Sequence, residues 1–259
     1  MIQQQTLEAS RSRLRQVRNP QFVGQATDLI VPEVGAPAPR PQAFLVEQSP
    51  NWTLPTHFHQ EHQFQVFVRG GGKLGRSEVQ HLAVHYASPH SGYGPLVSGD
   101  EGVAYLTLRA VGDTGAWYLP EQREQLQLRI PKRQAHGAPA GAMPLDAVAA
   151  LPQALLETLI EPDDTGLAAW VLRVPPGATA GLQAVAAGGG RFVVVQQGSL
   201  RSPAGELPAL GVAWVGAGDA LPLAAGAQGL EAVVVQFPAE AAQSFRELGP
   251  AIHAGTPAP

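Results

Sequence analysis

The stretch HFHQEHQFQVFVRG, residues 57–70, combines closely spaced histidines, an alternating run and a closing glycine. His57 and His59 are two residues apart, so on an extended strand both side chains point to the same face. Neutral imidazole is the commonest metal ligand in proteins, and two such groups on one face form a clip suited to Fe, Mn, Ni, Zn or Cu. The stretch therefore predicts a strand that presents two ligating side chains at its start.

Histidine is concentrated around this stretch. Six of the eight histidines lie between residues 57 and 90, where an even distribution over the 259 residues would place about one. The six are His57, His59, His62, His81, His85 and His90. Such a concentration favours a site to which imidazole groups contribute.

Short apolar runs continue in both directions from the histidine-rich stretch. Glycine (29 residues) and proline (24 residues) separate them, and only 15% of the residues are charged. Many short apolar runs between turn residues are typical of a β-sandwich or β-barrel. The runs are AFLVE from Ala43, FQVFV from Phe64, HLAVHYA from His81, VAYLTLRA from Val103, LAAWVLRV from Leu167, RFVVVQQGSL from Arg191, GVAWVG from Gly211 and LEAVVVQFP from Leu230.

The two halves of the chain repeat each other at an offset of 128 residues. With this shift FQVFVRG from Phe64 lies over FVVVQQG from Phe192, and AYLT from Ala104 lies over AVVV from Ala232, without a gap. Strand pattern and turn glycines register together, which favours a duplication over a chance match of alternating apolar residues. The chain is therefore expected to contain two copies of one small β domain.

The spacing His57-x-His59-x(3)-Gln63-x(6)-Gly70 resembles the first motif of the cupin superfamily, His-x-His-x(3–4)-Glu-x(6)-Gly. In that family the two histidines and the glutamate bind a divalent metal inside a small β-barrel. The resemblance covers both halves, about residues 42–110 and 170–238. It implies an all-β bicupin: two tandem cupin-like jelly-roll barrels with a few short helices.

This reading divides the chain into five segments. An N-terminal arm, loose or helical, is followed by a metal-binding candidate barrel, a connector, a degenerate barrel and a tail. The helical spacing of LDAVAALPQALLETLIE from Leu145 predicts a helix within the connector, interrupted by Pro152. The expected ranges are 1–20 for the arm, 21–112 and 161–240 for the barrels, 113–160 for the connector and 241–259 for the tail.

The metal site implied by the resemblance departs from the family pattern in two places. Gln63 stands where glutamate is usual, so the His57, His59 and Gln63 set carries no negative charge. The third histidine of the second family motif is replaced by Tyr93, which leaves His85 as a further ligand candidate. A metal held by a neutral set would be bound more weakly and would be a stronger Lewis acid.

Four residues near these ligand candidates have other expected roles or places. Tyr93 and His90 are the candidates for acid/base work or for fixing a substrate. Glu61 is expected as a surface carboxylate. His62 has the opposite strand parity and is expected to face outward.

The second half lacks the ligand set that the resemblance implies for the first. The family positions read Val185, Ala187, Arg191 and Leu221, of which none is a usual metal ligand. The second barrel is therefore expected to be free of metal and to have a structural or dimerising role. An arginine inside an empty barrel would be a carboxylate receptor.

Composition excludes several classes of protein. The chain has no cysteine, and 17 Lys+Arg stand against 21 Asp+Glu, for a net charge of −4. A disulfide scaffold and a thiolate metal site are thereby excluded, and nucleic acid is not expected as a partner. No apolar run approaches the length of a membrane-spanning helix, and no secretory signal is found. A cytoplasmic protein is expected, with homodimerisation as a further expectation.

Two function hypotheses of different classes follow. The first is a bicupin with a divalent metal (Fe, Mn, Ni, Zn or Cu) in its N-terminal barrel, acting as an oxygenase or isomerase on a small polar metabolite. The second is a non-catalytic bicupin that binds or senses a small molecule without metal. Because one fold hosts many chemistries, the sequence leaves open whether the protein is an enzyme. A storage or purely structural bicupin is a third, less favoured reading.

Overall fold

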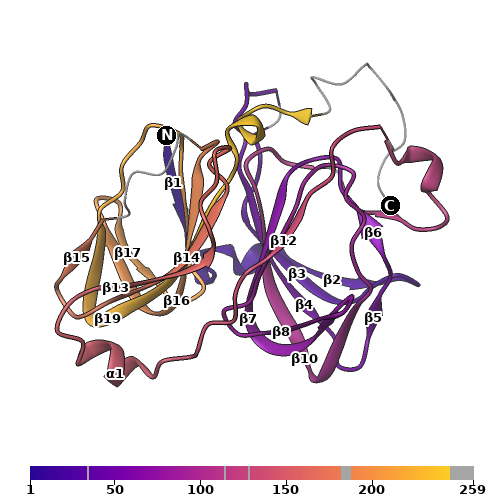
Figure 1. The fold of residues 1–259 in the computed structure, drawn as a ribbon. Coiled ribbons are helices and arrows are strands. Elements are labelled where there is room, and N and C mark those ends of the chain that lie inside the picture. The colour runs from indigo at the N-terminus through magenta and orange to yellow at the C-terminus, as the bar shows by residue number, and fades with distance from the viewer. Residues whose placement is uncertain (34, 114, 128, 182–187, 246–259) are drawn as a thin grey trace.

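The protein consists of two β-barrels that lie side by side (Figure 1). A computed structural model describes all residues except 34, 114, 128, 182–187 and 246–259. In the described part of the chain, helices are few and short, and none is long and apolar enough to cross a membrane. The all-β fold expected from the apolar runs is therefore confirmed.

The first barrel is built from one sheet in the order β12-β9-β7-β10-β4-β3-β2, to which β5 and β8 add as partners of β10 and β7. A separate two-stranded sheet of β6 and β11 lies beside it. The strands are β2 (Leu14–Arg18), β3 (Val23–Ile30), β4 (Gln42–Gln48), β5 (Thr53–Leu54), β6 (His57–Phe58), β7 (Gln63–Leu74), β8 (Ser77–Gln80), β9 (Val84–Ala87), β10 (Leu96–Arg109), β11 (Trp117–Tyr118) and β12 (Gln134–His136).

The second barrel repeats this order as β1-β18-β16-β19-β14-β13, with β15 and β17 paired to β19 and β16. Its strands are β1 (Ile2–Gln5), β13 (Leu155–Ile160), β14 (Ala168–Val174), β15 (Thr179–Ala180), β16 (Arg191–Ser202), β17 (Gly205–Pro208), β18 (Val212–Val215) and β19 (Leu223–Gln236). The helices are α1 (Leu145–Ala149) and the 3-10 helices η1 (Glu8–Arg13), η2 (Arg123–Gln125) and η3 (Ala239–Ala242).

The repeat read from the sequence corresponds to equivalent strands, with one correction. β7, β8 and β9 lie 128 residues before β16, β17 and β18. The offset falls to 127 in the last strand of each set, because Tyr105 pairs with Phe67 whereas Ala232 pairs with Val195. The ungapped alignment is therefore wrong by one residue over β10 and β19, and the position equivalent to Arg109 is Gln236.

A glycine at equivalent positions of β7 and β16 allows a neighbouring strand to approach closely in both barrels. Gly70 and Gly198 both have φ of +66°, which favours glycine. A Cβ atom at these positions would lie 2.2 Å from the carbonyl oxygen of Gly102 and 2.0 Å from that of Gly229. The closing glycine of the histidine-rich motif is thus required by the close approach of the neighbouring strand.

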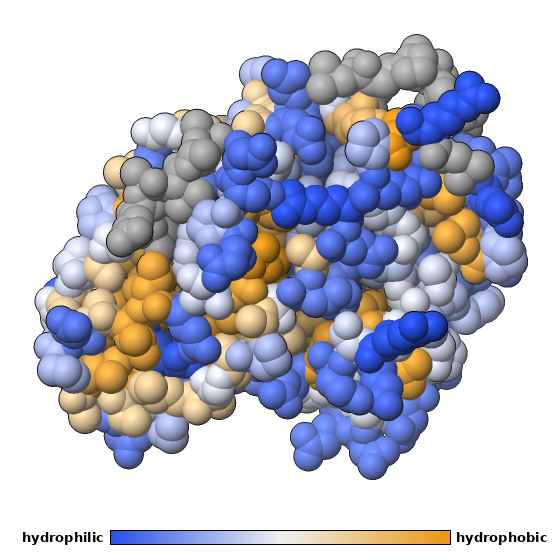
Figure 2. Space-filling view, in the orientation of Figure 1, coloured by the Kyte–Doolittle hydropathy of each residue, from blue (hydrophilic) through white to orange (hydrophobic). Residues whose placement is uncertain are grey.

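Strand alternation separates the pocket from the core that joins the barrels. On β10 the side chains of Leu106 and Leu108 are buried in a cluster that also contains Phe192 and Phe237 of the second half. The intervening residues of β10 face the interior of their own barrel, where Tyr105 packs in its apolar part. On the face seen in Figure 2, the lobe of the second barrel carries more apolar surface than that of the first.

Three segments differ from the sequence expectation. Part of the expected N-terminal arm forms β1, which pairs with β18 of the second barrel. The expected helix from Leu145 is real only as α1, and β13 occupies residues 155–160 because its backbone pairs with β14 in an antiparallel register. The division of the chain into domains stays a proposal, to which we add that β1 belongs to the second barrel.

A buried ion-pair network stabilises the second barrel. Arg173 donates to Glu231 at 2.7 Å, to Glu157 at 2.9 Å and to the main-chain oxygen of Gly141 at 2.5 Å. Glu231 is fully buried and also accepts from Gln197 at 3.0 Å. Removing one partner of such a pair leaves the other charge buried without compensation.

Arg173→Met is therefore expected to lower the free energy of unfolding by about 3–5 kcal/mol. The measurement is urea or guanidinium denaturation at neutral pH. Arg201→Met, on an exposed arginine of β16, is the matched control and is expected to change stability by less than about 0.5 kcal/mol. Equal effects of the two variants would contradict a stabilising role for the network.

Candidate functional site

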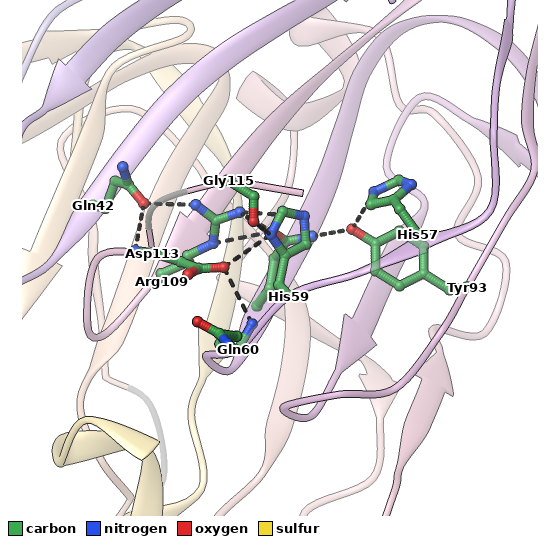
Figure 3. A network of polar contacts seen from close by, with 9 residues as sticks. Gln42, His57, His59, Gln60, Tyr93, Arg109, Asp113 and Gly115 are labelled. Carbon is green, nitrogen blue, oxygen red and sulfur yellow. Dashed lines mark hydrogen bonds and ion pairs between the residues drawn. The ribbon is translucent and has the colours of Figure 1, made fainter. Parts of the chain in front are cut away.

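The histidine pair lies at a cavity of about 310 Å³ in the N-terminal barrel. β6 supplies His57, the loop after it supplies His59, β7 supplies Gln63, and β10 supplies Arg109 (Figure 3). The segment after β10, expected as connector, crosses the barrel and contributes Asp113, Gly115 and Tyr118 to the lining. The lining also contains apolar side chains (Phe22, Phe44, Val46, Leu54 and Tyr105) and further polar ones (Arg15, Asn19, Asp28, Gln65 and Thr107).

His57 takes part in a chain of hydrogen bonds that fixes its tautomer. Its Nδ1 lies 2.8 Å from the carbonyl oxygen of Pro55, which can only accept, so Nδ1 donates. Its Nε2 therefore accepts from the hydroxyl of Tyr93 at 3.0 Å. That hydroxyl in turn accepts from the amide of Gln63 at 2.5 Å. The ring of His57 is thus held with Nε2 toward the cavity.

Arg109 lies among the side chains expected as metal ligands. Its Nη2 and Nε donate to Oε1 of Gln63 at 2.5 and 3.1 Å, and its Nη1 donates to Oε1 of Gln42 at 2.7 Å. The guanidinium carbon lies 5.5 Å from the ring centre of Phe44. The side chain is only 2% exposed, its hydrogen-bond acceptors Gln42 and Gln63 are neutral, and the nearby carboxylates of Asp113 and Glu61 act on its charge. A cation is therefore built in among the expected metal ligands.

His59 connects this arginine to a buried carboxylate. Its Nδ1 donates to the oxygen of Gly115 at 2.9 Å and to Oδ2 of Asp113 at 3.0 Å. Its Nε2 is therefore the ring acceptor, and Nη2 of Arg109 lies against the ring edge, 3.1 Å from Nδ1 and 3.4 Å from Nε2. Asp113 also accepts from the main-chain amide of Gln60 at 3.2 Å. The carboxylate thus fixes the imidazole from behind (Figure 3).

Burial keeps both histidines neutral near pH 7. Loss of solvation, reinforced by the neighbouring His59, lowers the pKa of His57 to about 3. Loss of solvation and then the positive charge of Arg109 lower the pKa of His59. Burial raises the pKa of Tyr93, so its hydroxyl stays protonated. Burial also lowers the pKa of Arg109, opposed by the charge of Asp113.

The donor set does not fit a divalent metal as it is arranged. Nε2 of His57 accepts from Tyr93, and Oε1 of Gln63 accepts from Arg109. A guanidinium beside these atoms would repel a dication. Over the described residues, no three His, Asp or Glu side chains come close enough to share a metal ion. The assignment of His57, His59, Gln63 and His85 as ligands stays a prediction.

Two of the predicted site residues lie away from the cavity. Nδ1 of His85 lies 3.0 Å from Oε1 of Gln65, and its Nε2 lies 3.4 Å from Oε1 of Gln134. His90 accepts from the main-chain amide of Gln127 at 3.3 Å and packs on Phe58. Neither histidine lines the cavity. The structure therefore brings together His57, His59, Gln63 and Tyr93 and leaves out His85 and His90.

The expectation of a surface carboxylate at Glu61 was wrong, whereas His62 points away from the pocket as expected but is buried. Glu61 is only 1% exposed, and its carboxylate accepts from Ser244 Oγ at 2.6 Å and from the amide of Phe245 at 2.9 Å. Nδ1 of His62 lies 2.6 Å from the hydroxyl of Tyr86. Both are covered because the segment after β19 packs on this loop.

Sequence reasoning missed Arg109 and Asp113. Arg109 carried a usable signal, because a charged residue stands in the apolar strand VAYLTLRA with the same parity as Tyr105. Asp113 carried none, since only the path of the chain after β10 brings it to His59. In the second barrel, Val185 and Ala187 lie outside the described residues, whereas Arg191 and Leu221 line a smaller cavity.

Comparison with solved structures places the chain among proteins of the same two-barrel architecture. A putative dioxygenase from Nostoc punctiforme has a TM-score of 0.59 at 14% identity, over 93% of this chain and 84% of that chain. The pirin YhhW of Escherichia coli, in complex with nickel(II), has a TM-score of 0.55 at 11% identity, over 92% and 99%. Oxalate decarboxylase of Bacillus subtilis, described with Mn(II) centres, has a TM-score of 0.54 at 14% identity, over 93% and 77%.

These similarities bear on the fold alone. No family model matches the sequence, and no curated protein matches it. The neighbours include proteins described with nickel or manganese. Identities of 10–14% indicate a shared fold and do not indicate shared ligands.

Proposed function

Because the chain has the two-barrel cupin fold, we propose that its N-terminal barrel binds a small organic carboxylate without a metal ion. The observation that carries the proposal is the guanidinium of Arg109, buried in the lining of the cavity among uncharged hydrogen-bond acceptors. Its positive charge takes the position in which the family pattern expects a metal.

Electrostatics favour an anionic ligand. A buried cation is stabilised when a carboxylate shares its desolvated space, and arginine binds carboxylates through two parallel hydrogen bonds. Asp113 is directed to Nδ1 of His59 and the amide of Gln60. A ligand carboxylate in the cavity would therefore add a second negative charge on the open side of Arg109.

The walls favour a ligand with an apolar body. Phe22, Leu54 and Tyr105 line the cavity together with Phe44, whose ring packs against the guanidinium of Arg109. A volume of about 310 Å³ is at the lower end of the range for small-molecule sites. The expected ligand is thus a monocarboxylate with an aromatic or branched apolar part, whose acid group lies near Arg109, His57 and Tyr93.

A metal-dependent enzyme is the second candidate, favoured by one observation. Both histidines have Nδ1 held by oxygen acceptors, so that Nε2 is the atom available to the cavity. Metal-ligating histidines are commonly fixed in this way. In that case Tyr93, bonded to His57, would be the acid/base residue, and the guanidinium of Arg109 would have to leave Gln63.

Metal analysis and ligand titration of one preparation decide between these candidates. Protein produced with Fe, Mn, Ni and Zn in the medium is expected to retain less than about 0.1 metal ion per chain. A panel of aromatic and branched monocarboxylates is expected to raise the melting temperature, and the matching amides are expected not to. Arg109→Gln should remove this shift.

The opposite pattern would support the metal enzyme. About one metal ion per chain, lost in His57→Ala and His59→Ala, contradicts the metal-free proposal. An increase in melting temperature on adding a monocarboxylate that persists in Arg109→Gln contradicts the role of the guanidinium. Tyr118→Phe, at the rim of the same cavity, is the control for general damage to the pocket.

A further inference from the structure

The second barrel contains its own cavity, of about 230 Å³, at the place equivalent to the N-terminal pocket. Arg191 is the charged residue in its described lining. The walls are aliphatic and include Ala180, Val193, Leu221 and Leu223. A single guanidinium among aliphatic side chains is the arrangement from which the inference starts.

The position of Arg191 is the counterpart of Gln63. The offset of 128 residues carries Gln63 to Arg191, and the offset of 127 carries Arg109 to Gln236. Arg191 and Gln236 are paired across β16 and β19. Each barrel therefore has one arginine and one glutamine at this pair of positions. The arginine is on β10 in the first barrel and on β16, the counterpart of β7, in the second. Each barrel thus directs one guanidinium toward its cavity.

Arg191 has little local compensation for its charge. Its Nη2 lies 3.4 Å from the main-chain oxygen of Asp219, which is a long hydrogen bond to a neutral group. The carboxylate of Asp219 is engaged by the amino group of Met1. Burial lowers the pKa of Arg191, which indicates that its charge is partly desolvated.

We propose that the cavity of the second barrel is a separate binding site for a small aliphatic monocarboxylate, whose acid group pairs with Arg191. A carboxylate matches the planar fork of the guanidinium, and an alkyl chain matches walls of alanine, valine and leucine. The smaller volume and the lack of aromatic side chains in its described lining separate its ligand from that of the first barrel. The proposal does not depend on the function proposed for Arg109.

The test is calorimetric titration of the full chain with hexanoate, with hexanol as the neutral probe and inorganic phosphate as the hydrophilic anion. It is carried out in the Arg109→Gln background, so that the first barrel does not contribute the signal. Hexanoate is expected to bind with a stoichiometry of one. Adding Arg191→Gln is expected to weaken it roughly ten- to a hundredfold, because a charge-assisted hydrogen-bond pair is lost.

Arg191→Lys separates charge from geometry, since lysine keeps the charge without the fork. Its affinity for hexanoate is expected to lie between that of the Arg109→Gln protein and that of the protein which also carries Arg191→Gln. An unchanged melting temperature would show that the variant is folded. Equal hexanoate binding before and after Arg191→Gln, or no binding at about 10 mM hexanoate, overturns the proposal. Phosphate that binds as tightly as hexanoate also overturns it, because the site is then a general anion site.

Discussion

The double variant Gln63→Glu/Arg109→Met is expected to retain one divalent metal ion per chain where the unaltered protein retains none. The change removes the guanidinium that donates to Gln63 and places a carboxylate beside Nε2 of His57 and His59. The side chains at positions 57, 59, 63 and 109 together carry a charge of +1 in the unaltered protein and −1 in the double variant. A set of imidazole and carboxylate ligands suits Ni²⁺, Zn²⁺ or Fe²⁺. Affinity for Ni²⁺ is expected to rise at least about 100-fold.

The single variants are the controls for this gain. Gln63→Glu alone gives a carboxylate that pairs with Arg109, so the metal must compete with a buried ion pair. Arg109→Met alone leaves a neutral set with weak attraction for a dication. Dialysis against Ni²⁺ followed by elemental analysis measures all four proteins. Equal nickel content in the unaltered protein and the double variant would show that Arg109 does not exclude metal.

The free energy of unfolding is expected to fall steeply as the pH drops from about 6 to 4, by about 5 kcal/mol per pH unit or more. Four histidines, namely His57, His59, His62 and His85, are buried with lowered pKa values, and burial of His90 lowers its pKa to about 4, so that a fifth proton adds to this slope. Loss of solvation is the main cause in each of the four, and it brings His57 and His85 to about 3 and His62 to about 4.

The direction follows from where the protons bind. In the unfolded chain each histidine takes up a proton near pH 6.5, whereas the folded protein keeps these four neutral until the pH is much lower. Their stabilising effect is therefore complete above about pH 6.5 and is lost as the pH falls toward the folded pKa values. Each proton contributes about 1.4 kcal/mol per pH unit.

Denaturation curves at several pH values measure this slope. His62→Phe should reduce it by about one proton, whatever its effect on stability at pH 7. Interaction with Glu231 raises the pKa of His81, so the stability that His81 contributes is lost as the pH rises above about 6.5. His81→Gln should therefore make the free energy of unfolding fall less as the pH rises above about 6.5. A free energy of unfolding that changes by less than about 1 kcal/mol between pH 7 and 5 would contradict the neutral, buried state of the four histidines.

The fold was predictable because its signals are local. Gly70 lies within β7 where the neighbouring strand approaches closely, and alternation along β10 separates Leu106 and Leu108 from Tyr105. The same features recur in the second half, so a shift of the sequence finds them. The one-residue error in the offset arose because the second half of β10 and of β19 is almost continuously apolar and buried on both faces, so a shift by one residue matches apolar residues nearly as well.

The site was predictable only in part, because its chemistry depends on long-range contacts. Spacing correctly grouped His57, His59 and Gln63 around one cavity. It could not show that Arg109, some fifty residues later, would donate to Gln63, or that Asp113 would fix His59. Glu61 was misjudged for the same reason, since Ser244 covers it from the other end of the chain.

The strand β1 gives the chain an unusual order of assembly. In the first barrel, β12 completes the sheet next to β9 and comes directly from the same half of the chain. In the second barrel the equivalent edge is closed by Ile2–Gln5, which pair with Val212–Val215. Ile2–Gln5 are therefore synthesised well before their partner strand and must wait for it. Cutting the chain between the barrels would leave the second half with an open sheet edge, so the two repeats have become a single cooperative unit of folding.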